Sequence, residues 1–205
     1  MSTLLQQLNG EISAILEIAG RGLVTVGHAR HGVGAGTVLH ADGLILTNAH
    51  VVRHGRPQVI LPDKRDLPAK VLAIDPDLDL AALSVEANDL PTIALGNSKE
   101  LQPGQLVFAL GHPWGVQGAV SAGPVIKVGL PPELPRLGRE YVQAGLQLRP
   151  GHSGGPMVDA HGRLVGINTM ITGPEVGLAV PVHVVKDFLR DRLGTQAASN
   201  EINYI

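Results

Sequence analysis

Pro150-Gly151-His152-Ser153-Gly154-Gly155-Pro156 is the most informative stretch of this sequence. Three glycines within residues 151–155 favour neither a helix nor a strand, but they suit a tight loop that presents one hydroxyl group. A serine that attacks an acyl carbon needs a base for its proton and N–H donors for the oxyanion that forms. We predict that Ser153 is such a nucleophile. The candidate oxyanion donors are the backbone N–H groups of Gly151, His152 and Ser153, with Gly151 and Ser153 foremost; an ordinary Gly-rich turn is the alternative.

A histidine and a carboxylate upstream of the loop complete a candidate hydrolytic site. His50 lies at the end of the apolar run 44–49, where a strand end can hold an imidazole and leave one ring nitrogen exposed. Asp79 leads directly into the apolar run 80–83, and a carboxylate buried there needs a partner such as an imidazole. Asp77 is the second choice, because Asp75-Pro76-Asp77 is typical of a turn.

The order of these residues along the chain separates the classes of hydrolase. Enzymes with a nucleophile elbow have the order Ser, Asp, His, and the subtilisin type has Asp, His, Ser. The order found here, His50, Asp79, Ser153, is that of the chymotrypsin type. That type is built from two β-barrels, so the residue order predicts a fold as well as a chemistry.

Short apolar runs separated by turn residues independently predict two groups of strands. We expect them at 23–26, 36–39, 44–47, 58–61, 70–74 and 80–84, and at 106–110, 120–128, 141–146, 157–158, 164–168 and 176–180. Ala41-Asp42-Gly43 between two apolar runs indicates a hairpin. Long helical periods between strands are lacking, which argues against a parallel βαβ sheet. We therefore predict an all-β, chymotrypsin/trypsin-like fold of two six-stranded antiparallel β-barrels.

Each end of the chain is expected to form a helix. Near the N-terminus, apolar residues share one helical face and the pattern stops at Gly20 and Gly22; they are Leu4, Leu8, Ile12, Ile15, Leu16 and Ala19. Near the C-terminus, a second apolar set repeats at helical spacing before Gly194; it consists of Val184, Val185, Phe188, Leu189 and Leu193. The first helix should pack on the body of the protein or on a neighbouring subunit. The expected organisation is a single protease unit with an N-terminal helix at 1–22, a first barrel at 23–90, a connector at 91–104, a second barrel at 105–183, and a C-terminal helix and tail at 184–205.

The amino-acid composition restricts the classes of molecule that this protein is expected to bind. A formal net charge of −2 argues against nucleic acid or an anionic membrane as the main partner. The absence of cysteine excludes disulfides, thiolate metal sites and a thiol nucleophile, and the pairs His28/His31 and His50/His54 lack matching acidic partners, so we expect no metal and no cofactor. The N-terminal segment has neither a basic region nor a long apolar run. We expect no membrane insertion and a cytoplasmic protein as the sequence stands, or a periplasmic one if a precursor segment was removed.

Five motifs together resemble the HtrA/Deg family of trypsin-like serine proteases. They are Thr47-Asn48-Ala49-His50-Val51-Val52, Asp79-Leu80-Ala81-Ala82-Leu83, Leu110-Gly111-His112-Pro113-Trp114-Gly115, the stretch Pro150 to Pro156, and Val165-Gly166-Ile167-Asn168-Thr169. The resemblance covers about residues 23–193 in the family's order and spacing. It implies a double β-barrel endopeptidase that cleaves unfolded or misfolded polypeptides and needs no cofactor.

The sequence departs from the family at several places. Family members usually carry PDZ domains after the protease domain, and this chain is expected to lack them. The residue before the nucleophile is usually Asn and here is His152, which also cannot replace the Asp that an N-terminal amine needs in zymogen activation. Family trimers often use aromatic N-terminal residues, which are missing here, so little supports a homotrimer. The segment 144–149, on the approach to the specificity pocket, also differs.

Substrate preference is predicted from the same region. Six residues before the nucleophile, a preference for Lys or Arg would want Asp, whereas Gln147 is found. A small apolar pocket is expected instead, with preference for Val, Ala or similar residues at P1; the candidate substrate-binding residues are Leu148, Ile167, Asn168, Thr169 and Met170. Two alternatives to an endopeptidase stay open, namely a catalytically silent peptide-binding or chaperone scaffold of the same fold and, less favoured, an esterase.

Overall fold

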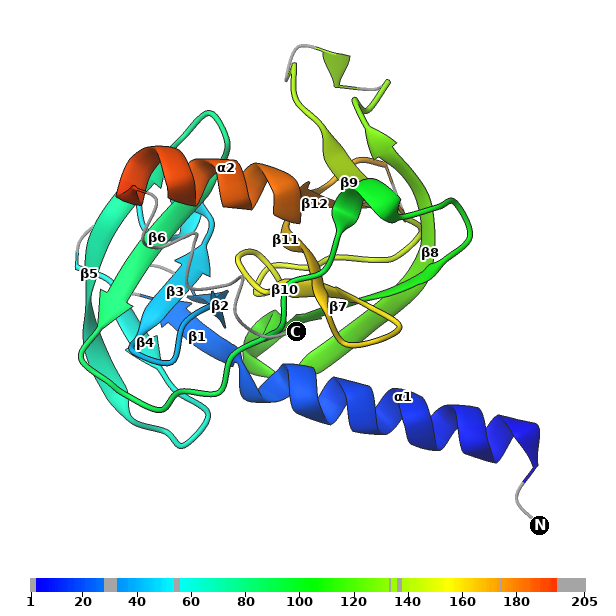
Figure 1. The fold of residues 1–205 in the computed structure, drawn as a ribbon, viewed down its shortest axis with the longest axis horizontal. Coiled ribbons are helices and arrows are strands. Elements are labelled where there is room, and N and C mark those ends of the chain that lie inside the picture. The colour runs from blue at the N-terminus through cyan, green and yellow to red at the C-terminus, as the bar shows by residue number, and fades with distance from the viewer. Residues whose placement is uncertain are drawn as a thin grey trace.

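Two closed antiparallel β-barrels stand side by side in the computed structural model, which describes residues 3–27, 33–53, 56–132, 134–135, 138–173 and 175–194 (Figure 1). The first barrel has the strand order β1-β2-β3-β6-β5-β4 and the second the order β10-β11-β12-β9-β8-β7. The predicted fold class is therefore confirmed. His28, His31 and His54, weighed above as metal ligands, lie outside the described residues.

The strands follow the predicted apolar runs, and β2, β5 and β11 extend beyond them by three or four residues at one end. In the first barrel they are β1 Leu23–Gly27, β2 Val33–Val38, β3 Leu44–Thr47, β4 Gln58–Ile60, β5 Asp66–Asp75 and β6 Leu80–Val85. In the second they are β7 Leu106–Gly111, β8 Ala119–Gly129, β9 Tyr141–Ala144, β10 Pro156–Asp159, β11 Leu164–Ile171 and β12 Gly177–Pro181. The hairpin expected at residues 41–43 joins β2 to β3, which pair antiparallel. β5 starts four residues before the predicted run because its first residues pair with β4.

Two α-helices and three short 3-10 helices complete the described structure. The α-helices are α1 Leu4–Arg21 and α2 Val182–Leu193, and the 3-10 helices are η1 Ala49–Val51, η2 Ser98–Glu100 and η3 Pro113–Gly115. Neither α-helix is long and apolar enough to cross a membrane.

Helix α1 packs on the protein only through its C-terminal half. A capping box starts it, because the Thr3 hydroxyl accepts the Gln6 N–H and the Gln6 side chain accepts the Thr3 N–H. Ala19 is buried and Ile12 and Leu16 are partly buried against the core, whereas the leucines of the first turns are exposed, and the helix projects from the barrels (Figure 1). Contact with the body of the protein is thus confined to the end nearest β1, and contact of the first turns with a neighbouring subunit stays a prediction.

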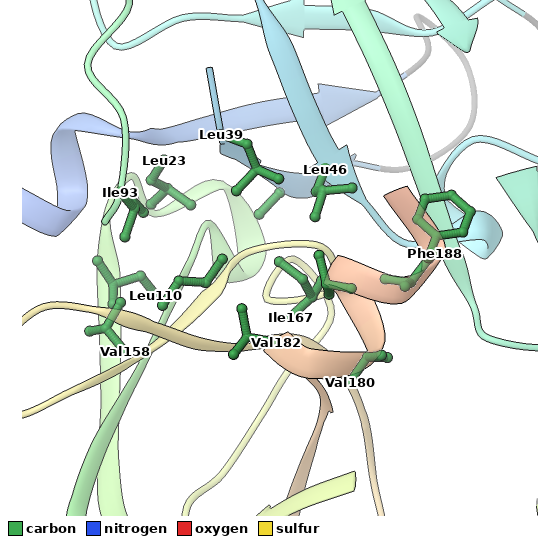
Figure 2. Packing of buried hydrophobic residues seen from close by; sticks show 14 of the residues in the cluster. Leu23, Leu39, Leu46, Ile93, Leu110, Val158, Ile167, Val180, Val182 and Phe188 are labelled. Carbon is green, nitrogen blue, oxygen red and sulfur yellow. The ribbon is translucent and has the colours of Figure 1, made fainter. Parts of the chain in front are cut away.

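The main hydrophobic core lies between the barrels and is shared by both (Figure 2). Its buried side chains come from the first barrel, the second barrel and α2; they include Leu23, Leu39 and Leu46, then Leu110, Val158, Ile167 and Val180, and then Val182 and Phe188. Helix α2 lies across the two barrels, and its Arg192 forms an ion pair of 2.9 Å with Asp75 at the end of β5. The shared core and α2 therefore fix the position of the loops of one barrel relative to the loops of the other.

Candidate active site

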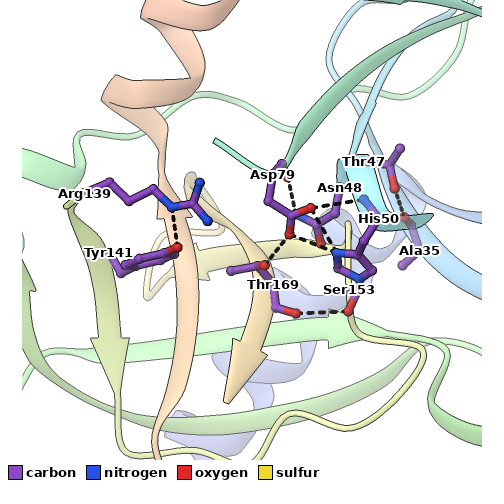
Figure 3. Close-up of polar contacts among 9 residues, drawn as sticks. All are labelled: Ala35, Thr47, Asn48, His50, Asp79, Arg139, Tyr141, Ser153 and Thr169. Carbon is purple, nitrogen blue, oxygen red and sulfur yellow. Dashed lines mark hydrogen bonds and ion pairs between the residues drawn. The ribbon is translucent and has the colours of Figure 1, made fainter. Parts of the chain in front are cut away.

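His50 and Asp79 meet at the edge of the first barrel. Strand β3 ends at Thr47, and the η1 turn that follows leaves the His50 side chain 43% exposed. The ring Nδ1 lies 3.0 and 2.9 Å from the two carboxylate oxygens of Asp79, and the His50 backbone N–H donates to Oδ1 at 3.1 Å. Asn48 is fully buried and donates from its amide to the Asp79 carbonyl at 2.9 Å, which fixes the two loops together (Figure 3).

The Asp79 carboxylate is buried and surrounded by donors. Asp79 is 7% exposed, and the Thr169 hydroxyl donates a hydrogen bond to its Oδ2 at 2.6 Å. Burial by itself would raise the pKa of Asp79, but the hydrogen bonds from His50 and Thr169 and the charge of His50 outweigh it and hold the pKa below its ordinary value of 3.8. The site therefore keeps a charged carboxylate against the imidazole.

Of the two carboxylates that the sequence left open, Asp79 is the one that contacts His50. Asp77 is exposed, and it lies in a turn in which the Asp75 carboxylate accepts the N–H groups of Asp77 and Leu78, both at 3.0 Å. These bonds are the turn chemistry expected for Asp75-Pro76-Asp77.

Ser153 lies beside His50 but comes from the second barrel (Figure 3). Its hydroxyl donates to the Thr169 carbonyl at 3.1 Å, and within the described part of the chain no hydrogen bond joins it to the His50 ring. Its carbonyl accepts the N–H of Ala35, on β2 of the first barrel, at 2.8 Å. A backbone hydrogen bond between the barrels thus anchors the serine next to the histidine.

The loop before Ser153 turns its carbonyl groups away from the site. The carbonyls of Gly151 and His152 accept the N–H groups of His112 and Gly155, each at 2.9 Å. In the described structure the N–H groups of Gly151 and Ser153 have no protein acceptor, so both are free to bind an oxyanion. The N–H of His152 donates to the Arg149 carbonyl at 2.9 Å, which removes it from the three donors expected from the sequence.

Only glycine fits at position 151. Its φ of 106° lies in the region that favours glycine, and a Cβ would lie 2.4 Å from the His112 carbonyl oxygen. The glycine requirement inferred from the sequence therefore has a specific cause, which is the close approach of this loop to the turn after β7.

The residues expected to bind substrate divide into two groups. Ile167 is fully buried in the core between the barrels, and fully buried Asn168 donates to the carbonyls of Leu110 and Pro156 at 3.0 and 3.1 Å. The Thr169 hydroxyl donates to Asp79 and the Thr169 carbonyl accepts from Ser153. Leu148 packs beside Leu146 in the core of the second barrel, and Met170 is partly buried. The substrate-binding role of all five residues stays a prediction.

Three groups that position the site were not found from the sequence. They are the Asn48 side chain, the Ala35 N–H and the Thr169 hydroxyl, whose partners lie 31, 118 and 90 residues away in the chain. Asn48 stands in the motif that contains His50 and Thr169 in the motif at residues 165–169, but neither motif shows these contacts. Among the described residues, no group of three or more His, Asp or Glu side chains is arranged to hold a metal ion.

Comparison with known proteins identifies the family of this chain. Residues 34–167 match the family described as trypsin-like peptidase domain, which is more than half of the chain. This chain belongs to the trypsin-like peptidases. Within that family it is an HtrA-type domain, as the resemblance predicted.

The relatives named below support the HtrA type. A probable periplasmic serine endoprotease, DegP-like, of Pseudomonas fulva is 42% identical over 165 residues, which are 76% of this chain and 33% of that protein. Mitochondrial serine protease HTRA2 of Bos taurus is 38% identical over 161 residues, 76% of this chain and 35% of that protein. The solved structure of the HtrA-type protease AlgW with a tripeptide has a TM-score of 0.81 at 28% identity and covers 88% of this chain and 62% of its own. This chain thus spans about a third of the length of these two curated relatives.

Proposed function

We propose that this protein is a serine endopeptidase in which Ser153 is the nucleophile and His50 the general base. Asp79 orients the His50 ring and stabilises its charged form. The observation that supports this best is the contact of 2.9 Å between the His50 ring and a buried carboxylate, next to a serine whose loop has two free N–H groups. Serine protease relatives and the family match support the same chemistry.

The reaction follows from these positions. The Ser153 hydroxyl leaves the Thr169 carbonyl and attacks the carbonyl carbon of the peptide bond, while its proton passes to Nε2 of His50. The oxyanion accepts hydrogen bonds from the N–H groups of Gly151 and Ser153. Collapse of this intermediate breaks the C–N bond, and the departing amine takes the proton from His50. Water then attacks the acyl-enzyme with His50 again as base, which releases the carboxylic acid and restores the Ser153 hydroxyl.

We propose unfolded polypeptides as substrates, with small aliphatic residues at P1. Support for polypeptides comes from the relatives, which are named as serine proteases. Support for the P1 preference comes from Leu146, Leu148 and Met170, which are apolar, and from Gln147, which carries no charge to pair with Lys or Arg. Cleavage of a peptide library checks this preference, and dominant cleavage after Lys or Arg would refute it.

Labelling with a fluorophosphonate probe tests the nucleophile directly. We expect the wild-type protein to form an adduct on Ser153 and to cleave casein, and Ser153→Ala to do neither, because the probe needs both an activated hydroxyl and an oxyanion hole. Asp77→Asn is the matched control and should label like the wild type. A folded wild-type protein that does not label would contradict the proposal and favour the silent scaffold, for which the hydrogen bond from Ser153 to Thr169 is the supporting observation.

For the compartment we propose the periplasm rather than the cytoplasm. Several DegP-like relatives, including those of Pseudomonas fulva and Halomonas elongata, are named as periplasmic. Fractionation of the source cells would check this, and recovery with cytoplasmic markers alone would contradict it.

A further inference from the structure

We propose that the neutral imidazole of His152 is a positioning residue, which holds the turn that presents the Gly151 N–H to the substrate, and that a proton on its Nδ1 releases this turn. The inference rests on the proposed role of Ser153. It adds a residue that touches no reacting atom and a dependence on pH that comes from His152.

The turn that carries Gly151 is closed by His152 from two sides. The His152 N–H donates to the Arg149 carbonyl at 2.9 Å, with Pro150 and Gly151 between them. Proline in the second position and a glycine with φ of 106° in the third are the features of a type II turn. The His152 side chain also contacts Arg149, because the Arg149 N–H donates a hydrogen bond to the His152 Nδ1 at 3.1 Å. Backbone and side chain together fix the orientation of the peptide group that contains the Gly151 N–H.

The hydrogen-bond pattern assigns the tautomer. Nδ1 lies 3.1 Å from the Arg149 nitrogen and 3.2 Å from the Arg149 carbonyl oxygen, so the ring could accept from one or donate to the other. The Arg149 carbonyl already accepts the His152 N–H, whereas in the described structure the Arg149 N–H has no acceptor except Nδ1. Nδ1 is therefore the acceptor, and the ring proton lies on Nε2.

The ring has no room to turn away. His152 is 3% exposed and packs on the end of β7, where a Cβ at Gly111 would lie 2.6 Å from its Cα and 3.2 Å from its Cδ2. Its Nε2 is buried without a hydrogen-bond partner in the described part of the chain. A change in the protonation of Nδ1 must therefore be accommodated by the turn itself.

The surroundings oppose a positive charge on this ring. Among the described residues, the charged and titratable groups that face it are the Arg149 guanidinium on its own loop and the His112 imidazole on the turn after β7, and both are basic. Burial lowers the pKa of His152 below 6.5, and the Arg149 charge lowers it further against the effect of the Arg149 carbonyl. His112 has a pKa lowered mainly by burial, with His152 adding to the effect. The neutral form of His152 is the one that the folded loop favours.

Protonation reverses one hydrogen bond of the turn. With a proton on Nδ1, the Arg149 N–H loses its acceptor and faces a second donor, and the Nδ1–H is left with the Arg149 carbonyl at 3.2 Å, which already accepts the His152 N–H, so the turn is weakened. The ordered loop is thus fully present above the ordinary histidine pKa and is lost as the pH falls below 6.5 through the lowered pKa of His152. Activity in acid should therefore fall more steeply in the wild type than in a variant whose residue 152 does not titrate.

Two substitutions separate the positioning role from simple packing. In His152→Asn the side-chain oxygen occupies the place of Nδ1 and accepts the Arg149 N–H but does not titrate, whereas His152→Ala lacks the acceptor. We expect His152→Ala to lower kcat by about 10- to 100-fold near pH 8 with little change in KM, since one oxyanion donor is worth about 100- to 1,000-fold. His152→Asn should stay within about threefold of wild type.

The pH profile carries the second half of the test. In acid, log kcat/KM of the wild type should fall more steeply than that of His152→Asn, because the Asn side chain does not take up a proton. His112→Asn, which removes the neighbouring imidazole, is the matched control and should keep the steeper slope. Wild-type kcat in a folded His152→Ala, no rescue by Asn, or equal slopes in wild type and His152→Asn would each overturn the inference.

A spectroscopic measurement keeps the inference testable without activity. In Ser153→Ala with ¹⁵N-labelled histidine, Nδ1 of His152 should give the signal of an unprotonated ring nitrogen near neutral pH, and the Gly151 amide signal should shift as His152 titrates in acid. A protonated Nδ1 near neutral pH would overturn the inference. A wild-type protein that neither labels nor cleaves would instead count against the proposed function and leave this readout intact.

Discussion

Asp79 is a charged residue that the first barrel buries, and the surrounding groups show how this is achieved. A carboxylate removed from water is costly unless donors replace its hydration. Asp79 accepts hydrogen bonds from the His50 N–H and the Thr169 hydroxyl and contacts the His50 ring. Its φ of 55° is left-handed, which Asp tolerates better than most residues. The donors come from both barrels, so the charge is stabilised only in the assembled site.

Replacing Asp79 by Asn should remove most of the activity without removing the fold. We expect kcat to fall by about 10⁴-fold, because an amide cannot hold the His50 tautomer that accepts the serine proton. Kinetics with a chromogenic peptide measure this, and Asp77→Asn, in the exposed turn next to it, should keep the wild-type rate. Similar losses in both variants would mean that the turn, and not the carboxylate, matters.

The same carboxylate should make stability depend on pH. Because its pKa in the folded protein lies below 3.8, the charged form stabilises the fold fully above pH 3.8 and this contribution is lost as the pH falls through the lowered pKa. The urea midpoint of the wild type should therefore drop more between pH 5 and pH 2 than that of Asp79→Asn, by roughly the effect of one shifted group. Parallel curves for the two proteins would contradict the assigned pKa direction.

At the scale of single residues, the sequence predicted the role of those residues whose immediate neighbours in the chain indicate it. His50 lies shortly after the end of a strand, Asp79 directly before the start of one, and Ser153 in a Gly-rich loop, so the neighbours of each residue indicate its role. For Ile167, Asn168 and Thr169 of β11, whose role in substrate binding stays a prediction, the sequence did not predict how deeply the side chains are buried. All three are buried, and the pairing with β12 shifts register between Asn168 and Met170. An irregularity in pairing changes which side chains face the core, and a sequence pattern does not reveal it.

At the scale of elements, the end of β7 supports the loop that carries Gly151. Gly111 is the last residue of β7, and a Cβ there would lie 2.6 Å from the His152 Cα and 2.8 Å from the Gly151 carbonyl oxygen. Both contacts are with backbone, which cannot move aside as a flexible side chain can. The position of the oxyanion loop therefore depends on the absence of a side chain on a neighbouring strand.

Gly111→Ala should displace that loop and leave the barrels intact. We expect kcat to fall by about 10- to 100-fold with a smaller effect on stability, because the loop can shift while the ladder between β7 and β8 is kept. Gly20→Ala, where a Cβ meets open space in α1, is the control and should keep full activity. Circular dichroism checks that Gly111→Ala is folded, and kinetics measure its kcat. A folded Gly111→Ala variant with the wild-type kcat would contradict the close packing of Gly111 against the oxyanion loop.

The elements themselves could be predicted because short apolar runs and turn residues alternate regularly along this chain. What could not be predicted was how far an amphipathic helix is covered. The apolar face of α1 runs from Leu4 to Ala19, yet Leu4 is 80% exposed and Ala19 1%. Amphipathic spacing indicates that a face is suited to burial. It does not say how much of its length meets a partner.

At the scale of the whole molecule, the two barrels depend on each other. The largest core cluster combines side chains of both barrels and of α2, and the proposed catalytic residues are divided between the barrels in the same way. Ser153 is tied to the first barrel through the Ala35 N–H, and Asp79 to the second through the Thr169 hydroxyl. A site assembled in this way exists only while the barrels are packed together.

Unfolding should therefore occur in one transition that removes structure and labelling together. Phe188 of α2 is 2% exposed in the shared core, and α2 packs on strands of both barrels. Phe188→Ala should cost about 3–5 kcal/mol and lower the Tm by roughly 10 °C, because a large cavity opens between the barrels. Lys186→Ala, on the exposed face of the same helix, should change the Tm by less than about 2 °C. Far-UV circular dichroism and fluorophosphonate labelling are both measured during heating. Two separate transitions, or labelling that persists after the circular dichroism signal of the strands is lost, would show that the barrels do not unfold as one unit.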